Sequence, residues 1–323
     1  MFEKMIEKLK ADQQKLVFTE GSDPRILEAA SRLKQEKILE PILLGNPGEI
    51  HEASKKHGFS IDGIEIIDPL DYPEMDSMVA RLVELRKGKM DEAACRDALK
   101  KSNYFGTMLV QMGYAAGLLG GATYSTADTV RPALQIVKTK PGNSIVSSCF
   151  IMHRETENGD ERYAMGDCAI NISPTVDELV EIAVETAKTA RIFSIDPKVA
   201  MLSYSSMGSG KGEMVDKVRE ATEKLKSIDL DFPVDGELQF DAAFVPEVAK
   251  TKVKDSPVAG QANTFIFPDI NAGNIGYKIA QRLGGFEAIG PILQGLNAPI
   301  NDLSRGCNAD EVYKMAIITA SLR

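Results

Sequence analysis

The strongest constraint on the fold is that short apolar segments alternate with amphipathic helical segments along the first part of the chain. Apolar runs at residues 15–20, 42–45 and 64–68 are predicted as strands, with helices between them. The first run ends at Asp23-Pro24, a favourable helix start because proline lacks an N–H that the first helical turn would leave unbonded. Strands that alternate with helices predict a parallel, doubly wound α/β sheet.

A second pattern begins about half-way along the chain. Residues 144–152 and 162–170 are predicted as strands joined by a hairpin, because Glu157-Asn158-Gly159-Asp160 between them is typical of a turn. Thr175 and Glu178 then have the spacing of a helix capping box. The chain has 323 residues, enough for two domains. The predicted domains are residues 1–141 with 303–323, and residues 142–302.

The composition excludes several classes of function. A formal net charge of -9 argues against general nucleic-acid binding, which needs a concentrated basic surface. No apolar run approaches the roughly 20 residues that span a bilayer, and the acidic residues of the N-terminal segment are unlike a secretory signal. Four scattered cysteines without a CxxC pair predict reduced thiols in a cytoplasmic protein. Three histidines make a His-based metal cluster or triad unexpected.

Residues 234–241 are acidic and are predicted as a turn-bounded segment. Asp235, Glu237 and Asp241 offer oxygen ligands of the kind that a divalent metal ion binds. The alternative, which we favour, is that these side chains are surface carboxylates that cap a turn. We therefore predict no metal site.

Residues 205–212 form a hydroxyl- and glycine-rich loop between a predicted buried strand, residues 198–204, and a helix. A P-loop would need glycine in place of Ser205 and a hydroxyl residue in place of Gly212, so a kinase-type nucleotide site is not supported. The loop retains a composition suited to binding a phosphate or an acyl oxygen. The inward face of the following helix is predicted to be Met214, Val215, Val218, Ala221 and Leu225.

Ser304 and Arg305 lie between an apolar run at residues 288–293, predicted as a buried strand, and a helix predicted from residue 309. Helix-start amides, a hydroxyl and a guanidinium can together hold an anion, phosphate especially. Alternatively, the polar residues 301–304 only cap the helix and Arg305 is a solvated charge. The local spacing leaves both interpretations open.

Two other basic positions allow the same pair of interpretations. The cluster of Arg86, Lys87 and Lys89 would suit the phosphates of a nucleotide. Alternatively, it is only the solvated end of a helix predicted over residues 76–89, where the helix dipole favours positive charge. Arg131 lies in a polar, turn-like segment that joins a strand to a helix.

Six strings of residues, in this order, resemble the phosphate acetyltransferase (phosphotransacetylase) family of the short bacterial and archaeal type. They are LRKGK at 85–89, STADTVRPALQIVKT at 125–139, PKVAMLSYSSMGSGKGEMVDKV at 197–218, DGELQFDAA at 235–243, NAGNIGYKIAQR at 271–282 and PINDLSRG at 299–306. The strings run through essentially the whole chain without large gaps. That agreement is far more specific than any single motif.

The resemblance implies an architecture and a reaction. The expected fold has two α/β domains with a cleft between them, as in isocitrate and isopropylmalate dehydrogenases, and the expected assembly is a homodimer. The expected reaction is the reversible transfer of an acetyl group between coenzyme A and phosphate, by direct thiolate attack in a ternary complex. Coenzyme A is then a substrate, and no tightly bound cofactor or metal is implied.

Matching positions imply roles for individual residues. Arg305 is expected to bind the phosphoryl group, and Ser304 to hydrogen-bond the thioester side. Arg86 and Arg131 match arginines of CoA binding, and Arg282 matches another arginine of the cleft. The other positions expected in substrate binding are Ser125, Ser206, Gly208, Ser209 and Asn274.

The expected general base lies where the chain departs from the family's pattern. The family has Glu then Asp shortly after the SRGC run, whereas this chain has Asp310-Glu311. If the chain aligns with the family without a gap, the general base is Glu311. If the short loop before it is shifted, the base is Asp310. Both residues are retained as candidates, and Glu311 is preferred. A thiol with a pKa near 8.5 needs only modest help from a carboxylate. Cys307 is interpreted as a packing thiol, because the implied mechanism has no acyl-enzyme.

Other functions are less well supported. A metal- and NAD-dependent hydroxyacid dehydrogenase of the related fold would need an aspartate cluster and a Tyr/Lys pair, of which we find no convincing set. A non-catalytic sensor of acyl-CoA or acetyl phosphate is disfavoured by the intact Ser304, Arg305 and Arg131. An enzyme that prefers propionyl or butyryl groups would differ in pocket size, which the sequence does not show.

Overall fold

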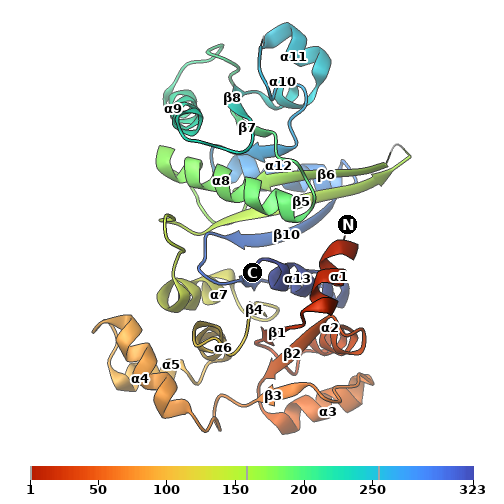
Figure 1. Cartoon of the computed structure of the whole chain (residues 1–323), viewed down its shortest axis with the longest axis vertical. Helices are drawn as coiled ribbons and strands as arrows, with labels where there is room; N and C mark the ends of the chain where they lie inside the picture. Colours follow the sequence, from red (N-terminus) through yellow and green to blue (C-terminus); the bar gives the residue numbers. More distant parts are fainter. Residues whose placement is uncertain (1, 158, 254) are drawn as a thin grey trace. The chain divides into compact units, whose positions relative to one another are not determined.

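The computed structural model describes residues 2–157, 159–253 and 255–323, and it divides into two compact units (Figure 1). The first unit is Met1–Pro141 with Leu296–Arg323, and the second is Gly142–Gly295. The chain returns to the first unit at Leu296 and not at residue 303 as predicted. The reason is that β11 (Ile300–Asp302) pairs with β4 (Gly117–Gly120) in the sheet of the first unit.

The sheet of the first unit is parallel throughout, in the order β11-β4-β1-β2-β3, which confirms the predicted parallel α/β sheet. Its other strands are β1 (Gln14–Phe18), β2 (Leu39–Leu44) and β3 (Glu65–Ile67). Its helices are α1 (Glu3–Ala11), α2 (Pro24–Gln35), α3 (Pro47–His57), α4 (Met75–Arg86), α5 (Glu92–Ala98), α6 (Ser102–Gln111), α7 (Thr126–Pro132) with the π-helical turn η1 (Ala133–Val137), and α13 (Ala309–Ser321).

Both ends of the chain contribute to this unit. The last helix α13 packs against α1 and α2, and Figure 1 shows α1 (red) beside α13 (dark blue). The predicted start of α2 is confirmed, since Asp23 is the N-cap residue and its Oδ1 accepts a hydrogen bond from the N–H of Arg25 at 2.9 Å. Val17 of β1 and Phe105 of α6 are fully buried in one core cluster.

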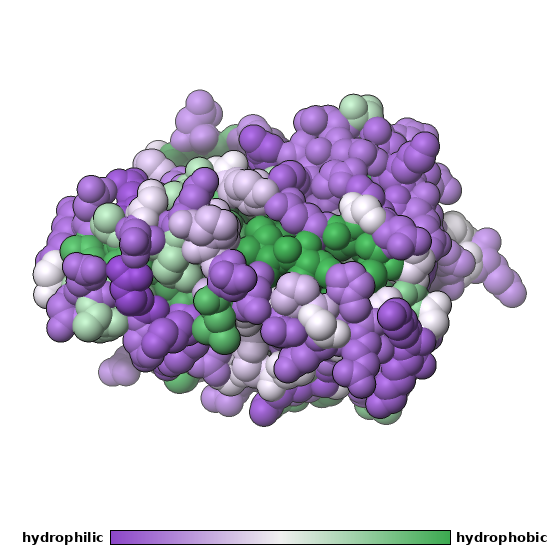
Figure 2. All heavy atoms as spheres, turned by 90° about the horizontal axis from the view of Figure 1, so that it is seen from below, coloured by the Kyte–Doolittle hydropathy of each residue, from purple (hydrophilic) through white to green (hydrophobic). Residues whose placement is uncertain are grey.

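The strand β3 forms an open edge of the sheet, and its residues Ile66 and Ile67 are only half-buried. Figure 2 views the molecule from the side on which β3 lies in Figure 1, and it shows a strip of apolar residues between hydrophilic ones. The β3 edge therefore combines unpaired backbone groups with half-buried isoleucine side chains.

The second unit contains a mixed sheet in the order β10-β5-β6-β9-β7-β8. The strands β10, β5 and β6 are antiparallel neighbours, and the remaining pairs are parallel. The strands are β5 (Ser147–Thr156), β6 (Gly159–Gly166), β7 (Val199–Leu202), β8 (Val234–Leu238), β9 (Thr264–Ile266) and β10 (Glu287–Gln294). The helices are α8 (Val176–Ile192), α9 (Glu213–Ser227), α10 (Phe240–Phe244), α11 (Pro246–Lys252) and α12 (Ile270–Arg282).

The local predictions for this unit have mixed outcomes. The hairpin is confirmed by the pairing of β5 with β6, although Asn158 in its turn lies outside the described residues. The capping box of Thr175 and Glu178 is confirmed at the start of α8. Met214 is wrong as an inward residue, since its side chain is 41% exposed.

The strand predicted at residues 288–293 exists as β10, but it belongs to the second sheet. The strand that leads to Ser304 is the three-residue β11. Within the described ranges, no helix combines the length and apolar character needed to cross a bilayer.

Candidate functional site

Ser304 and Arg305 lie in the loop between β11 and α13, at the carboxyl end of the first unit's parallel sheet, where α/β proteins place ligand loops. Both residues are exposed. The loop turns back on itself: the N–H of Cys307 donates to the carbonyl of Ser304 at 2.9 Å, and the N–H of Gly306 donates to Ser304 Oγ at 3.3 Å. The Ser304 hydroxyl is therefore an acceptor within the loop and keeps its own hydrogen for a ligand.

The interpretation of residues 301–304 as a helix cap is wrong. Asn301 and Asp302 are buried in β11. The N-cap residue of α13 is Asn308, whose Oδ1 accepts from the N–H of Glu311 at 2.9 Å. The exposed side chains of the loop are therefore not used by the start of the helix.

The two candidate general bases have different surroundings. Asp310 forms ion pairs with Lys314 at 3.1 Å and Arg32 at 3.5 Å. Burial raises the pKa of Asp310, but the two cations outweigh burial and hold this pKa below its usual value. Glu311 Oε2 accepts from the N–H of Asn308 at 3.0 Å, which leaves Oε1 without a hydrogen bond to any described residue. Since a lower pKa makes a weaker base, these surroundings favour Glu311.

Glu20, which the sequence reasoning missed, orders the segment that follows β4. Its Oε1 accepts from the N–H and hydroxyl of Thr123 at 2.6 and 2.8 Å. Its Oε2 accepts from the N–H groups of Gly121 and Ala122 at 3.1 and 3.3 Å. The position of Glu20 just after the central strand β1 is the signal that could have identified it.

Asp302, also missed, connects β11 to α7. The residue is 3% exposed, and its carboxylate accepts hydrogen bonds from the hydroxyls of Thr126 at 2.6 Å and Thr129 at 2.5 Å. Burial raises the pKa of Asp302 despite these two donors. Gly121 makes the approach possible, because a Cβ there would lie 2.2 Å from Asp302 Oδ1 and its φ of +99° favours glycine.

The predicted CoA-binding arginines of the first unit keep unused donors. Arg131 lies on α7 and is exposed, with one long ion pair to Asp128 at 3.9 Å. Ser125 precedes this helix and donates to Asp128 Oδ2 at 2.7 Å. Arg86 ends α4; its Nη1 donates to the carbonyl of Gln135 at 3.4 Å, and its Nε is buried with no partner among the described residues.

The loop of residues 203–212 in the second unit bonds to itself. Five consecutive N–H groups are used within the unit: Ser206 to Ser209 Oγ (2.9 Å), Met207 to Glu237 O (3.1 Å), Gly208 to Glu237 Oε1 (2.7 Å), Ser209 to Ser206 O (3.1 Å) and Gly210 to Ser205 Oγ (2.8 Å). Ser206 Oγ is also occupied, since it accepts from the N–H of Gln239 at 3.0 Å. The loop therefore does not offer these five amides to a phosphate.

Glu237 is the centre of that loop's hydrogen bonds. It lies on β8, a buried strand, so the prediction of surface carboxylates is wrong for Asp235 and Glu237. Glu237 accepts from the Ser205 hydroxyl at 2.8 Å and from Arg219 Nε at 3.3 Å, and Asp235 pairs with Lys226 at 2.5 Å. Charges can be buried when they are paired in this way. Over the described residues, no three His, Cys, Asp or Glu side chains are grouped to hold a metal ion.

The remaining predicted residues of the second unit lie on α12. Asn274 is in the first turns of the helix and donates to the carbonyl of Cys168 at 3.0 Å. Gly273 allows this close packing, because a Cβ there would lie 2.4 Å from the carbonyl oxygen of Asp167. Arg282 is in the last turn and is exposed.

Cys307 is buried beside Ser304 and Arg305. Burial raises the pKa of its thiol, so the thiol is protonated near neutral pH. This environment agrees with a packing role and gives no support to a thiolate nucleophile.

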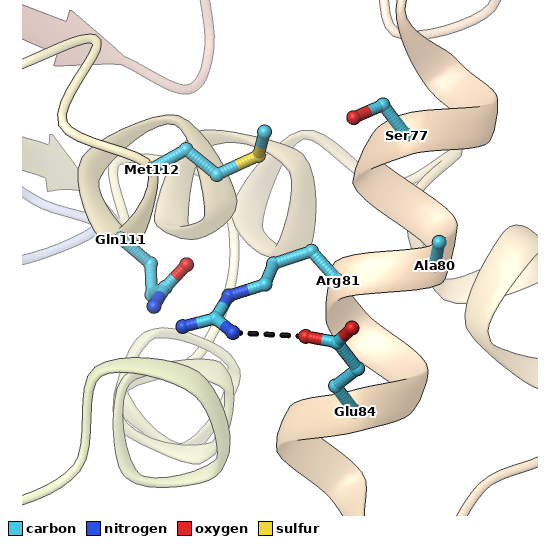
Figure 3. Close-up of a pocket in the computed structure, with 6 residues that line it drawn as sticks. All are labelled: Ser77, Ala80, Arg81, Glu84, Gln111 and Met112. Atoms are coloured by element: carbon cyan, nitrogen blue, oxygen red, sulfur yellow. Dashed lines mark hydrogen bonds and ion pairs between the residues drawn. The ribbon is translucent and has the colours of Figure 1, made fainter.

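A pocket of about 480 Å³ lies between α4 and the end of α6 (Figure 3). The Arg81 side chain extends across it and pairs with Glu84 at 2.9 Å, while Gln111 and Met112 face it from the end of α6. Because α6 leads into the amino end of β4, the pocket is at the opposite end of the parallel sheet from Ser304. It contains none of the predicted site residues.

Comparisons with known proteins agree over the whole chain. The model of the family described as "Phosphate acetyl/butaryl transferase" matches residues 1–320. The phosphate acetyltransferase of Bacillus subtilis (strain 168) is 54% identical over 321 residues, which cover 99% of this chain and 98% of that protein. A second phosphate acetyltransferase, from Staphylococcus epidermidis (strain ATCC 12228), is 52% identical over 320 residues, 98% of this chain and 96% of that protein.

A solved structure agrees as well. The crystal structure of a phosphotransacetylase from Streptococcus pyogenes is 58% identical and superposes with a TM-score of 0.96, covering 99% of this chain and 97% of that chain. The chain belongs to the phosphate acetyl/butyryl transferase family, and is therefore a transferase of acyl groups.

Proposed function

We propose that the protein is a phosphate acetyltransferase, which interconverts acetyl-CoA and phosphate with CoA and acetyl phosphate. The observation that carries the proposal is the pair of exposed side chains, Ser304 and Arg305, on a loop at the carboxyl end of a parallel sheet in a chain of this family. The guanidinium is suited to a phosphate dianion, and the hydroxyl to the developing oxyanion.

In the proposed mechanism the CoA thiolate attacks the carbonyl carbon of acetyl phosphate in a ternary complex, and phosphate leaves. Arg305 binds the phosphoryl group and Ser304 donates its hydroxyl hydrogen to the carbonyl oxygen. Glu311 takes the thiol proton, supported by its unoccupied Oε1. In the reverse direction phosphate attacks acetyl-CoA and the same carboxyl group returns the proton to sulfur.

The residues proposed to bind CoA are considered within each unit separately. Arg86 and Arg131, with their unused donors, would pair with phosphates of CoA. Ser125, which precedes the helix of Arg131, is a further proposed contact. Arg282 is exposed and suits the same purpose. Ser209, whose hydroxyl keeps its hydrogen, is a further proposed contact. Ser206, Gly208 and Asn274 would contribute through the shape of their segments, because the donors described above are already bonded. No tightly bound cofactor, metal or nucleic acid is part of the proposal.

The direct test mixes the purified protein with CoA and acetyl phosphate and follows the ultraviolet absorbance of the thioester. Propionyl and butyryl phosphates run in parallel, which determines the preferred acyl chain. Formation of acetyl-CoA that requires both substrates is the expected result. Absence of thioester with every short acyl phosphate would contradict the proposal.

We further propose a cytoplasmic homodimer. The cysteines Cys95, Cys149, Cys168 and Cys307 are unpaired, which supports a reducing compartment. Three exposed apolar side chains, those of Ile275 and Ile279 on α12 and of its C-cap residue Leu283, support self-association. Light scattering on the eluting protein would give twice the chain mass if the proposal is correct, and a single chain mass would refute it.

A further inference from the structure

Arg25 is a residue of α2 that the family-matched strings do not include. Its guanidinium forms a two-point contact with the helix N-cap residue Asp23, from Nε to Oδ1 at 2.9 Å and from Nη2 to Oδ2 at 2.8 Å. The side chains of Arg25 and Asp23 are 26% and 12% exposed, so the pair is largely shielded from water. The carboxylate neutralises the guanidinium, which leaves Arg25 a donor of hydrogen bonds and a poor site for a phosphate.

The opposite edge of the same guanidinium binds backbone carbonyls from two loops. Nη1 donates to the carbonyls of Arg305 at 2.9 Å and Cys307 at 3.2 Å. Nη2 donates to the carbonyl of Ala122 at 2.9 Å. These carbonyls belong to the loops that follow β11 and β4, so one side chain connects both loops to the start of α2.

We propose that Arg25 is a positioning residue, which orients the Ser304-Arg305 pair by holding the carbonyls of residues 305 and 307. This inference rests on the proposed function. Fixing the carbonyl of Arg305 restricts the peptide plane next to its Cα, and hence the direction in which its side chain leaves the loop. Arg25 itself does not touch substrate.

Only arginine has the donors for this arrangement. A guanidinium presents five N–H groups in a planar fork, whereas a lysine ammonium presents three from one point. Lysine at position 25 retains the charge and can retain the pair with Asp23, but it cannot reach Ala122, Arg305 and Cys307 together. Arg25→Lys is therefore the variant that separates positioning from charge.

The test compares Arg25→Lys with the wild type in acetyl-CoA synthesis and in amide hydrogen exchange. We expect kcat to fall about 30-fold, since small misplacements of a catalytic group can cost up to about 100-fold. We expect the KM for CoA to change less than about 2-fold, and the amides of residues 303–308 to exchange at least about 10-fold faster. Arg96→Gln, which removes an exposed arginine paired with Asp76 and Glu92, is the matched control and should behave as wild type.

A double-mutant cycle separates positioning from general loss of stability. If Arg25 acts through Arg305, then Arg25→Lys lowers kcat far less in an Arg305→Ala background than in the wild type. An equal loss in both backgrounds, or wild-type kcat in Arg25→Lys, would overturn the inference. Wild-type protein without any acetyl transfer would instead contradict the proposed function. The exchange measurement then still decides whether Arg25 fixes the loop, because unchanged exchange rates overturn the inference whatever the activity.

Discussion

The two units each present a loop between a parallel strand and a helix, and the two loops are held in opposite ways. The loop of residues 303–308 is held through backbone carbonyls by Arg25, which leaves the side chains of Ser304 and Arg305 exposed. The loop of residues 203–212 is held through its own amides and hydroxyls around the buried Glu237. The difference indicates that the first loop is built to present side chains, while the second is built mainly for a fixed backbone shape.

The largest expected effect is that of Arg305→Ala. Loss of the guanidinium removes the charge-assisted hydrogen bonds to phosphate, so we expect kcat/KM for acetyl phosphate to fall about 1000-fold. Steady-state kinetics with varied acetyl phosphate measures the loss. Arg96→Ala serves as a control on the same unit. A loss below about 10-fold would mean that the first loop does not recognise substrate through this side chain.

Substitution of the two carboxylates on α13 is expected to have unequal effects. Glu311→Gln should lower kcat about 100-fold, because the base is lost, while Asp310→Asn should change kcat less than about 3-fold. Both variants are measured with CoA and acetyl phosphate at saturating concentration. The reverse order of effects would identify Asp310 as the base and require its ion pairs with Arg32 and Lys314 to break during turnover.

The second loop should respond to Glu237→Gln mainly through stability. The amide cannot satisfy all the donors of Ser205, Gly208 and Arg219, so we expect the free energy of unfolding to fall by about 2–3 kcal/mol. Urea denaturation followed by circular dichroism gives this value. A variant as stable as wild type would show that Glu237 does not organise the loop.

The stability that Glu237 contributes to the second loop depends on pH in a defined direction. Burial raises the pKa of Glu237, but its hydrogen-bond donors outweigh burial and hold the pKa below the usual 4.5. The carboxylate therefore contributes stability that is fully present above about pH 4.5 and is lost as the pH falls through the lower folded-state pKa. The stability difference between wild type and Glu237→Gln should be constant from pH 7 to 5 and should shrink at more acidic pH. A difference that grows on acidification would contradict the sign of this shift.

The smallest expected effect is that of Ser209→Ala. Ser209 is exposed and its hydroxyl keeps one hydrogen for a ligand, so its loss should raise the KM for CoA about 3-fold with little change in kcat. The loss of its bond to the N–H of Ser206 should cost about 0.5–1 kcal/mol of stability. If Ser209→Ala abolished turnover, the contrast between the two loops would be wrong, because the second loop would then also act through a side chain.

The parts of the fold that follow from local pattern were predictable from the sequence. Alternating strands and helices, the hairpin of β5 and β6 and the capping box at Thr175 each depend on residues close together in the chain. The short strand β11 was missed, because three residues are too few to show the alternation of apolar and polar residues that is typical of a strand. The strand β8 was mistaken for a turn, because its carboxylates are buried against cations that lie elsewhere in the sequence.

In the candidate site, too, local motifs were predictable from the sequence, whereas contacts between distant residues were not. Ser304 and Arg305 could be proposed as site residues from the sequence, because a hydroxyl and an arginine precede a helix within one short motif. Arg25 could not, since its role depends on contacts with residues 280 and 282 positions further along the chain. For Asp302 the sequence allowed only the alternative of a helix cap, because the hydroxyls of Thr126 and Thr129 that bind it are distant in sequence.

The discontinuity of the first unit has a consequence for biosynthesis. The second unit is one continuous stretch, residues 142–295, and can form its sheet as soon as that stretch has left the ribosome. The first unit is complete only when β11 and α13, which follow the second unit in the chain, have also left the ribosome together with the loop of Ser304 and Arg305 between them. A chain that stops at residue 295 would therefore hold a folded second unit but lack the loop of Ser304 and Arg305, so we expect it to show no acetyl transfer.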